Sequence, residues 1–324
     1  MVVISIIVTS YSWDRIHDIE GLLASVKAQN ARNLELIYVI EGHKDLEYEV
    51  ARKVNRLKID ARVVYNEGNP GLAEARNWGA SIARGEILGF VDDDVILDPD
   101  WTQVVEETFQ KHPGVVGLTG PAKPIWVGAE NNWFPAAIDW LIGCTGWFDS
   151  EYAVEVGNVW GMNMAFRRSE FNMTGGFAPK SFEASRYLRS GAPSNIKQER
   201  TQFIQVKMAE DVEFSLRIRR ATGRRLIYVP TMVVHSKVYP YRLTTEYICK
   251  RSRWVAYTRK NVSKSPASTR ASTSFERGLL AKLLLAFLPF GKEHPANLFE
   301  FSKRTKVLLL VLCSLLVGNL VGPV

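Results

Sequence analysis

The stretch GEILGFVDDDVILDPDW, residues 85–101, decides the fold. An apolar run at 87–91 is followed directly by Asp92, Asp93 and Asp94, and apolar residues then resume. The first run predicts a short strand that is buried on both faces. Three adjacent carboxylates repel one another, and burying any of them without a partner is costly. A positively charged group is therefore expected beside them.

Two interpretations of the triple aspartate are open. Aspartate is common in turns, and the Asp98-Pro99-Asp100 sequence just downstream is typical of one. Carboxylates after a buried strand also suit a hard cation, because Mg²⁺ or Mn²⁺ takes one or two of them and fills its shell with substrate phosphates and water. We favour a site for a metal ion and a diphosphate.

Segments of strand and helix character alternate before the triple aspartate. Strand patterns cover residues 2–9, 34–40, 61–65 and 87–91, and helix patterns cover 16–29, 47–57 and 72–83. This alternation predicts an α/β layer with a mostly parallel sheet. Ligands of such sheets bind outside the carboxyl ends of the strands. Thr9, Ser10, Tyr11 and Glu41 fall at those ends, as the triple aspartate does, so the topology alone predicts a site there.

The second half of the chain is less regular. Strand patterns cover 159–166, 226–229 and 232–235, and a helix pattern covers 210–222. Residues 178–207 are polar and lack periodicity, which is typical of a functional or flexible loop.

A loop with two glycines opens a helix in NEGNPGLAEARN, residues 66–77. Helix N-termini favour anionic groups, so this loop, including Asn69, is a candidate contact for a nucleotide. Arg76 lies one turn into the helix, where its guanidinium could neutralise a pyrophosphate or pair with a nearby aspartate. A plain helix start with Arg76 in solvent is the alternative.

Two other positions have both a structural and a functional interpretation. Glu210 and Asp211 begin the helix pattern EDVEFSLR, and acids in a first helical turn are ordinary capping chemistry. Asp211 also follows the irregular segment 178–207, as a general base beneath a mobile lid would. His235 ends the strand pattern VPTMVVH; a lone histidine there is commonly structural, but imidazole also binds Mn²⁺.

Charge is unevenly divided along the chain. Residues 1–236 carry 26 Lys and Arg against 30 Asp and Glu, whereas 237–324 carry 15 against 4. A basic segment suits nucleic acid or an anionic membrane surface. The apolar run 307–324 is near the lower length limit for spanning a bilayer, and 279–290 is typical of an interfacial helix. We favour a membrane whose basic side is cytoplasmic; two helices buried in the globular body are the alternative.

The remaining signals concern the compartment. Cys144, Cys249 and Cys313 have no metal-binding or redox spacing, which fits a reducing environment. The first residues, MVVISIIVTSY, lack the basic region and the cleavage site of a signal peptide. Both observations agree with a position on the cytoplasmic face of a membrane.

Together these motifs resemble the family 2 glycosyltransferases, which have the GT-A fold. The likeness rests on the order and approximate spacing of VVISIIVTSY, an acidic residue after the second strand, NPGLAEARNWGASIARGE, FVDDD, GMNMAFRRSEFNMTGGF, EDVEFSLR and VPTMVVH. It implies an α/β fold with a Rossmann-like mixed sheet flanked by helices. Residues 1–236 would be the catalytic domain, with a nucleotide-sugar-binding half at 1–120 and an acceptor-binding half at 121–236. Residues 237–324 would form a basic and apolar helical region that associates with a membrane.

The resemblance also implies roles for individual residues. Asp211 is expected to deprotonate the acceptor hydroxyl, so that the sugar is displaced directly with inversion. Asp94 is expected to hold Mn²⁺ or Mg²⁺, with His235 as a second candidate ligand. The residues expected at the nucleotide sugar are Thr9, Tyr11, Glu41, Asn69, Arg76, Asp92 and Asp93. Those expected around the donor sugar and the acceptor are Gly161, Met162, Asn163, Glu210, Arg251, Arg253 and Trp254.

The region around Arg253 bears on how many sugars are added. Processive members of the family carry a Gln-x-x-Arg-Trp motif, but no glutamine lies three residues before Arg253. We therefore expect transfer of a single sugar. Arg251, Arg253 and Trp254 are then candidates for contact with an acceptor phosphate, because guanidinium groups suit bidentate recognition.

The expected function is thus a metal-dependent, inverting glycosyltransferase at the cytoplasmic face of a membrane. Its donor would be a UDP- or GDP-sugar, and its acceptor a polyprenyl-phosphate or polyprenyl-linked saccharide used in glycan assembly, with no role for nucleic acid. A nucleotidyl or phosphoryl transferase with the same metal-phosphate site is one alternative, although no phosphate loop of the Gly-x-x-x-x-Gly-Lys type occurs. A non-catalytic protein that binds sugar nucleotides is the other.

Overall fold

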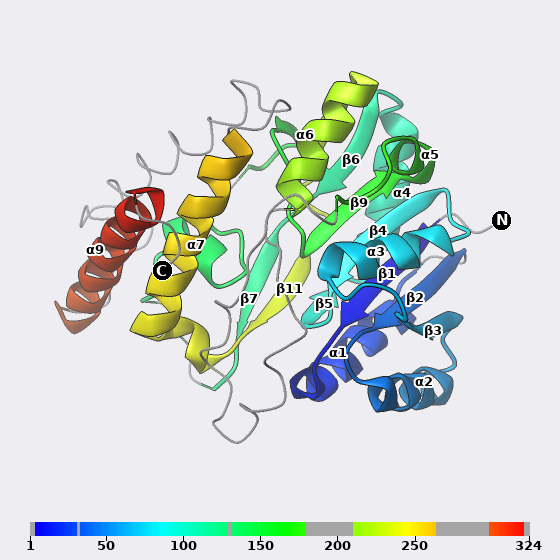
Figure 1. Cartoon of the computed structure of the whole chain (residues 1–324), viewed down its shortest axis with the longest axis horizontal. Helices are drawn as coiled ribbons and strands as arrows, with labels where there is room; N and C mark the ends of the chain where they lie inside the picture. The colour runs from blue at the N-terminus through cyan, green and yellow to red at the C-terminus, as the bar shows by residue number, and fades with distance from the viewer. Residues whose placement is uncertain are drawn as a thin grey trace.

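The computed structural model describes residues 4–30, 33–128, 131, 133–148, 150–178, 210–263 and 298–320. Figure 1 shows a central sheet with helices around it and a pair of long helices at the end of the molecule opposite the N-terminus. The expected loop 178–207, apart from its first residue, and the whole apolar segment 279–290 lie outside the described residues.

Eight strands form the central sheet. They are β1 (Ile4–Ser10), β2 (Leu34–Ile40), β3 (Ala61–Tyr65), β4 (Ile87–Asp92), β6 (Val115–Thr119), β8 (Val154–Val156), β9 (Asn163–Arg167) and β10 (Arg225–Tyr228). Their order is β3-β2-β1-β4-β9-β6-β10-β8. The first four of these run parallel, whereas β9 is antiparallel to both β4 and β6. The expected mixed sheet flanked by helices is confirmed.

A smaller sheet of three strands adjoins the central one. It has the order β5-β11-β7, with β5 at Val95–Leu97, β11 at Val234–Val238 and β7 at Ala122–Trp126. β11 is antiparallel to β5 and parallel to β7. Because β5 follows β4 across a turn at Asp93 and Asp94, the two sheets meet at the triple aspartate.

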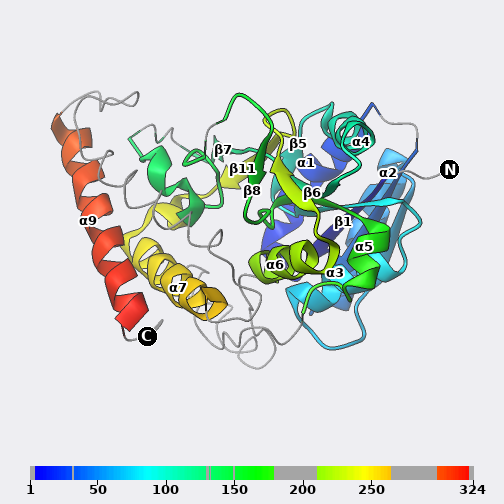
Figure 2. The same ribbon diagram turned by 90° about the horizontal axis from the view of Figure 1, so that it is seen from above.

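Helices cover both faces of the central sheet (Figure 2). They are α1 (Ile16–Lys27), α2 (Lys44–Leu57), α3 (Leu72–Ser81), α4 (Trp101–Lys111), α5 (Arg168–Met173) and α6 (Glu210–Thr222), with short 3-10 helices η1 (Trp13–Arg15) and η2 (Ala136–Leu141). One core holds apolar residues of α1, α2 and α4, and another holds residues of α3, α5 and α6. Successive residues of β1 enter different cores, Ile6 the first and Ile7 the second. This explains the unbroken apolar run of β1, since its two faces are both buried.

The C-terminal part consists of η5 (Pro240–Leu243), α7 (Thr245–Ser263) and α9 (Leu298–Leu320). Helices α7 and α9 lie side by side in both views (Figures 1 and 2). Val307 and Leu308 of α9 are buried in a third core together with Ile248 of α7. One face of the apolar run expected at 307–324 is thus packed inside the molecule. Among the helices of the described residues, none has the length and apolar character needed to cross a bilayer.

Glu35 forms a buried ionic cluster that joins β2 to the loop before β4. Its carboxylate accepts hydrogen bonds from Ser5 Oγ at 2.6 Å, the Arg84 backbone N–H at 2.6 Å and Arg62 Nη2 at 2.8 Å. Burial alone would raise the pKa of Glu35, but these hydrogen bonds outweigh it and lower the pKa to about 2. The stability they contribute is therefore present above the unfolded-state pKa and is lost as the pH falls through about 2.

We expect Glu35→Gln to lower the free energy of unfolding by about 2 kcal/mol at neutral pH, because hydrogen bonds to a charged group are lost. The difference from wild type should shrink as the pH falls toward about 2. Urea unfolding across that range measures both effects. The matched control is Glu49→Gln, whose partner Arg52 is exposed, and it should leave stability close to that of wild type, because an exposed ion pair contributes little. Equal losses in the two variants would contradict the buried cluster.

Candidate active site

The carboxyl ends of β1 and β4 bring Thr9 beside Asp92. The two residues are partners in the parallel register of these strands. One residue further along, Ser10 donates a hydrogen bond from its hydroxyl to Asp93. Tyr11 then leaves the sheet with 47% of its surface exposed. The carboxyl ends of β1 and β4 therefore carry polar side chains and an accessible aromatic ring, at the place where the topology predicted a site.

Two arginines neutralise the buried carboxylates at this edge. Arg15 of η1 donates from Nη1 to Asp94 Oδ2 at 2.9 Å, and its Nε lies 3.9 Å from Asp93 Oδ1. Arg242 of η5 donates from Nη2 to the same oxygen of Asp94 at 2.6 Å and from Nη1 to the carbonyl oxygen of Ile142 at 2.8 Å. The positive charge that the triple aspartate required is thus supplied by a pair of guanidinium groups.

The acidities of Asp93 and Asp94 differ. Burial raises the pKa of Asp93 to about 7, although Arg15 opposes the rise. Burial would raise the pKa of Asp94 as well, but the guanidiniums of Arg242 and Arg15 outweigh it and hold that pKa below its usual value. Asp94 is therefore ionised at neutral pH, which is the state that a cation ligand requires.

Glu41, after β2, supports the loop that opens α3. Its Oε1 accepts hydrogen bonds from the Gly71 N–H at 2.9 Å and from Asn66 Nδ2 at 2.8 Å. Asn66 Nδ2 also donates to the carbonyl oxygen of Asn69 at 3.2 Å, and Asn69 is exposed. Burial raises the pKa of Glu41. Glu41 thus lies under the loop, and Asn69 lies on its surface.

A second charged network surrounds Arg76 of α3. The guanidinium donates to Glu210 Oε1 at 2.8 Å, to Asp92 Oδ1 at 3.1 Å and to the Gly161 carbonyl oxygen at 2.9 Å. The Gly161 N–H in turn donates to Asp211 Oδ2 at 2.9 Å. The network therefore joins the end of β4 to the start of α6, the two places where the sequence predicted acidic site residues.

Asp211 is a fixed but accessible carboxylate in the first turn of α6. Besides the bond from Gly161, its Oδ1 accepts from the Val212 N–H at 2.8 Å, and the residue is half-buried. The adjacent Glu210 is buried, and burial raises its pKa to about 7, with Arg76 opposing the rise. Of the two acids, Asp211 has the access to solvent that a base acting on a bound acceptor needs.

The three residues 161–163 have different surroundings. Gly161 and Met162 are half-buried, whereas Asn163 is 0% exposed. Asn163 Oδ1 accepts from Trp101 Nε1 at 2.8 Å, and its Nδ2 donates to two backbone carbonyls at 2.7 and 3.2 Å. The side chain of Asn163 is thus engaged in the core, and the structure does not bring it to the acidic network.

We expect Asn163→Ala to lower the free energy of unfolding by about 1–3 kcal/mol, because the buried Trp101 N–H loses its acceptor. Urea denaturation followed by tryptophan fluorescence measures the change. Asn158→Ala is the control, since Asn158 is half-buried and its Nδ2 donates to the neighbouring Val159 carbonyl at 2.9 Å. Unchanged stability together with weaker nucleotide binding would instead put Asn163 at the ligand.

His235 is the second residue of β11. It pairs with Ile96 of β5, whereas Lys237, two residues on, donates its N–H to the Asp94 carbonyl oxygen at 3.1 Å. The register therefore puts Lys237, and not His235, beside Asp94. Lys237 Nζ is itself paired with Asp18 at 3.0 Å. The structure does not bring His235 to the triple aspartate.

Arg251, Arg253 and Trp254 all lie on α7, the helix that packs against α9. Trp254 is buried, and its ring centroid lies 5.9 Å from that of Tyr257 on the same helix. These three residues thus belong to the C-terminal helical part and not to the strand ends that carry the aspartates.

The carboxylates at this site could hold a divalent cation only if atoms of a bound ligand complete its coordination shell. Within the described ranges, no group of three or more His, Cys, Asp and Glu side chains is arranged to hold a metal ion. Asp94 is an ionised, hard oxygen donor at a strand end, and Mg²⁺ commonly binds through one or two carboxylates while phosphates and water complete its shell. A cation at Asp94 would compete with Arg15 and Arg242 for Oδ2.

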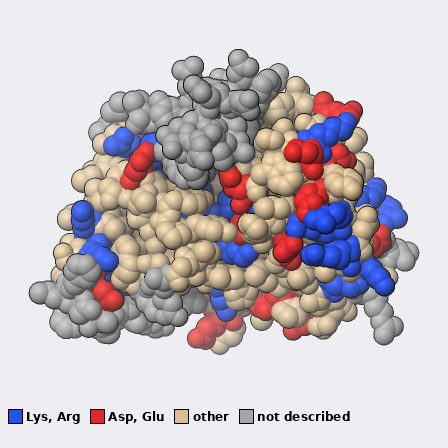
Figure 3. Space-filling model, turned by 90° about the horizontal axis from the view of Figure 1, so that it is seen from below, with Lys and Arg blue, Asp and Glu red and all other residues tan. Residues whose placement is uncertain are grey.

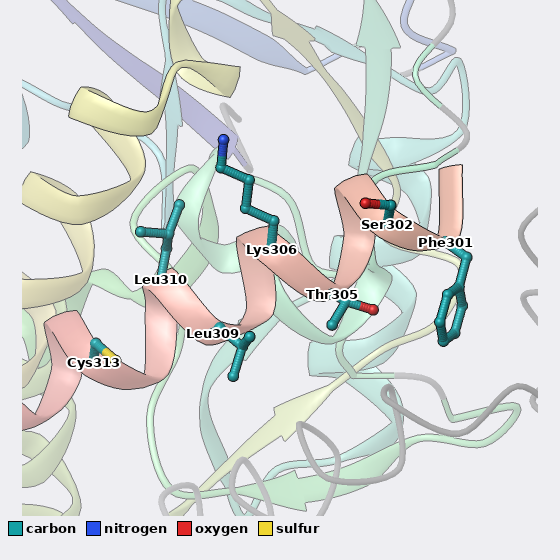
Figure 4. Close-up of a pocket in the computed structure, with 7 residues that line it drawn as sticks. All are labelled: Phe301, Ser302, Thr305, Lys306, Leu309, Leu310 and Cys313. Atoms are coloured by element: carbon teal, nitrogen blue, oxygen red, sulfur yellow. The ribbon is translucent and has the colours of Figure 1, made fainter. Parts of the chain in front are cut away.

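Figure 3 shows Lys and Arg gathered beside Asp and Glu over one end of its face, with fewer charges at the other end. A groove of about 690 Å³ runs along α9, and Figure 4 shows the residues that line it, which are Phe301, Ser302, Thr305, Lys306, Leu309, Leu310 and Cys313. Its lining combines apolar side chains with one lysine.

Two residues at this site, Arg15 and Arg242, were not among the candidates from the sequence. Ser10 was expected at the end of the first strand, and the structure shows that it bonds Asp93. Arg15 and Arg242 had no usable signal in the sequence, because they reach Asp94 from 79 and 148 residues away along the chain.

Residues 5–172 match the sequence model of glycosyl transferase family 2, which is more than half of the chain. The glucosyl-dolichyl phosphate glucuronosyltransferase of Haloferax volcanii is 28% identical over 258 residues, which cover 79% of this chain and 76% of that protein.

Solved structures give the same fold. The mannosyltransferase PcManGT from Pyrobaculum calidifontis, in complex with GDP-Man and Mn²⁺, has a TM-score of 0.59 at 16% identity, covering 98% of this chain and 87% of its own. S. aureus TarS 1–349 in complex with UDP-GlcNAc has a TM-score of 0.53 at 15% identity, covering 97% and 81%. The α/β fold of this chain is therefore GT-A-like.

Proposed function

Because this chain belongs to glycosyl transferase family 2, we propose that it moves one sugar from a nucleotide diphosphate sugar to a lipid-linked acceptor. The observation that carries the proposal is the single polar edge formed by the triple aspartate, Arg76 and the Glu210–Asp211 pair. An ionised carboxylate for the donor and an oriented carboxylate for the acceptor are the two groups that direct displacement needs.

The donor is proposed to bind at the ends of β1, β2 and β4. Tyr11 is exposed there, Asn69 is exposed on the loop over Glu41, and Asp92 has 42% of its side chain exposed. Asp94 would hold Mn²⁺ or Mg²⁺, and when bound the cation stabilises the charge that develops on the diphosphate leaving group. The neighbour solved with GDP-Man and Mn²⁺ supports use of a divalent cation.

The acceptor is proposed to be activated by Asp211. Its carboxylate takes the proton of the acceptor hydroxyl, the hydroxyl oxygen forms a bond to the anomeric carbon, and the bond from that carbon to the diphosphate oxygen breaks. Attack from the opposite face inverts the anomeric configuration, and no covalent intermediate on the protein is required. The two hydrogen bonds that fix the Asp211 carboxylate support this assignment.

A dolichyl- or other polyprenyl-phosphate-linked sugar is the proposed acceptor. The relative from Haloferax volcanii, whose name describes a glucosyl-dolichyl phosphate glucuronosyltransferase, supports that choice. Residues 1–236 would carry the chemistry and 237–324 would hold the chain at the cytoplasmic face of a membrane. The exposed face of α9 supports the second part, since Leu309 and Leu316 are exposed and Leu309 lies about one turn after the exposed Lys306.

The first test is calorimetric titration with UDP and with GDP, each in the presence of Mn²⁺, Mg²⁺ or a chelator. We expect one of the two nucleotides to bind, and to bind more tightly with a divalent cation than with the chelator. Failure of folded protein to bind either nucleotide under any metal condition would contradict the donor site. Release of sugar 1-phosphate from a bound nucleotide sugar, with transfer of the nucleotidyl group, would favour a nucleotidyl transferase instead.

A further inference from the structure

Arg76 is buried in a way that leaves little room for a ligand. Only 3% of its surface is exposed, and its guanidinium is bound to Glu210, Asp92 and the Gly161 carbonyl at 2.8–3.1 Å. It also lies 5.8 Å from the centroid of the Phe177 ring. An arginine that neutralises a diphosphate must point N–H groups at the phosphates, and those of Arg76 point at protein atoms.

We infer that Arg76 is a positioning residue, which acts on the acceptor side of the reaction by holding Asp211 and Glu210 in place, and does not bind the donor phosphates. This inference rests on the proposed function, in which Asp211 is the base. It differs from the grouping of Arg76 with the residues at the nucleotide sugar, and it agrees with the alternative in which Arg76 pairs with a nearby aspartate.

Gly161 is the link through which Arg76 reaches the base. The carbonyl oxygen of Gly161 accepts from Arg76, while its N–H donates to Asp211 Oδ2. A β-carbon added to Gly161 would lie 3.4 Å from Arg76 Nη2 and 3.5 Å from Asp211 Oδ2, so both groups pack against this one residue. Fixing the Gly161 carbonyl therefore fixes the direction of the N–H that orients the base.

Glu210 is the second link, since its ion pair with Arg76 anchors the first turn of α6 immediately before Asp211. Asn77, next to Arg76 on α3, adds to the rigidity of the arginine. Its Nδ2 donates to the Phe177 carbonyl at 2.7 Å and its Oδ1 accepts from the Phe177 N–H at 2.8 Å. The positions of Arg76 and the aromatic ring beside it are thus set by the same short stretch of α3.

The test compares Arg76→Lys and Arg76→Gln with wild type, after wild-type sugar transfer has been measured. Lysine keeps the charge but lacks the planar fork that reaches three acceptors. We expect kcat to fall by about 100-fold in Arg76→Gln, as for a misplaced catalytic group, and by less in Arg76→Lys. The dissociation constant of the nucleotide, measured by calorimetry, should stay at the wild-type value in both variants.

A pH profile separates positioning from a loss of structure alone. The groups that act on Glu210 are Arg76, Asp211 and Asp92, and of these only Arg76 favours the ionised carboxylate. Loss of Arg76 should therefore move the acid limb of the kcat profile to higher pH. In Arg76→Ala, low concentrations of guanidinium ion should partly restore kcat, because the ion fits the space that the side chain leaves.

The matched control is Arg217→Gln. Arg217 lies on α6. Like Arg76, it bonds a carboxylate (Glu213, 2.8 Å) and a backbone carbonyl (Gly176, 2.5 Å), and its guanidinium lies 5.2 Å from the centroid of an aromatic ring, that of Phe214. The Arg217→Gln variant should be less stable than wild type but keep the wild-type pH profile of kcat. An Arg76→Lys or Arg76→Gln variant that binds nucleotide ten times more weakly would overturn the inference, and so would an unmoved acid limb. Wild-type protein that binds nucleotide but transfers no sugar would overturn the proposed function first, and this inference with it.

Discussion

Asp211→Asn is expected to lower kcat by about 10²–10⁴-fold, the range that a positioned general base contributes. Asparagine can still accept the hydrogen bond from the Gly161 N–H, so the start of α6 should keep its structure. It cannot take a proton from an acceptor hydroxyl. Steady-state kinetics measure kcat, and calorimetry should give an unchanged dissociation constant for the nucleotide.

The control for this variant is Glu213→Gln. Glu213 is another acid in the first turn of α6, but its carboxylate is paired with Arg217 at 2.8 Å. Replacing it should leave kcat close to the wild-type value. If Asp211→Asn kept wild-type turnover, another group would have to be the base, and the buried Glu210 would be the next to test.

The second large effect is expected for Asp94→Ala, which should abolish the dependence of nucleotide binding on a divalent cation. It should also reduce stability by about 3–5 kcal/mol, because removing one partner of a buried pair leaves the other charge uncompensated. Arg242, whose side chain is 10% exposed, would be that charge, whereas Arg15 would keep its contacts with Asp18 and Asp93. Calorimetry with and without a chelator measures the first effect, and urea unfolding measures the second.

The control is Asp100→Asn, which separates the effects of Asp94→Ala from a general effect of removing a negative charge. Asp100 belongs to the same stretch, but it is exposed and bonds Asn30 Nδ2 at 2.8 Å at the surface. It should keep both stability and metal-dependent binding. Metal-dependent nucleotide binding that survives in folded Asp94→Ala would mean that the cation is held elsewhere.

The first half of the fold follows from local sequence patterns. The boundaries expected at 34–40 and 61–65 are those of β2 and β3, because unbroken apolar or β-branched runs are easy to recognise. Helix α4 was missed although Trp101, Val105 and Phe109 are buried at helical spacing. The proline and aspartates just before it are typical of a turn, and they obscure the start of the amphipathic pattern that follows.

The second half depends on contacts that no local pattern contains. Strand β9 inserts antiparallel between β4 and β6, which are otherwise consecutive strands of the central sheet. The strand expected at 159–166 begins only at Asn163, because Trp160 and Asn163 bridge each other across a turn. Gly161 is thereby left in the turn, with its N–H and carbonyl free to bond Asp211 and Arg76.

The site was partly predictable for the same physical reasons. The ends of the expected strands identified Thr9 and the triple aspartate as site residues. The need for a positive charge beside the aspartates followed from electrostatics alone. Arg76, which pairs with Asp92, was a candidate partner for a nearby aspartate. Arg15 and Arg242 could not be identified from the sequence, since they are distant from Asp94 along the chain. For Asn163 the motif predicts a contact with the ligand, whereas in the structure its side chain bonds Trp101 and two backbone carbonyls in the core.

The most direct test of the account is a product measurement. Protein in vesicles containing dolichyl phosphate-linked glucose, with Mn²⁺ or Mg²⁺, is given a panel of UDP- and GDP-sugars, and the lipids are analysed by mass spectrometry. The account predicts that one donor adds the mass of a single sugar residue, with release of the nucleoside diphosphate, and that Asp211→Asn forms no such product. Lipid that stays unmodified with every donor, while a nucleotide sugar is bound by the folded protein, would contradict it.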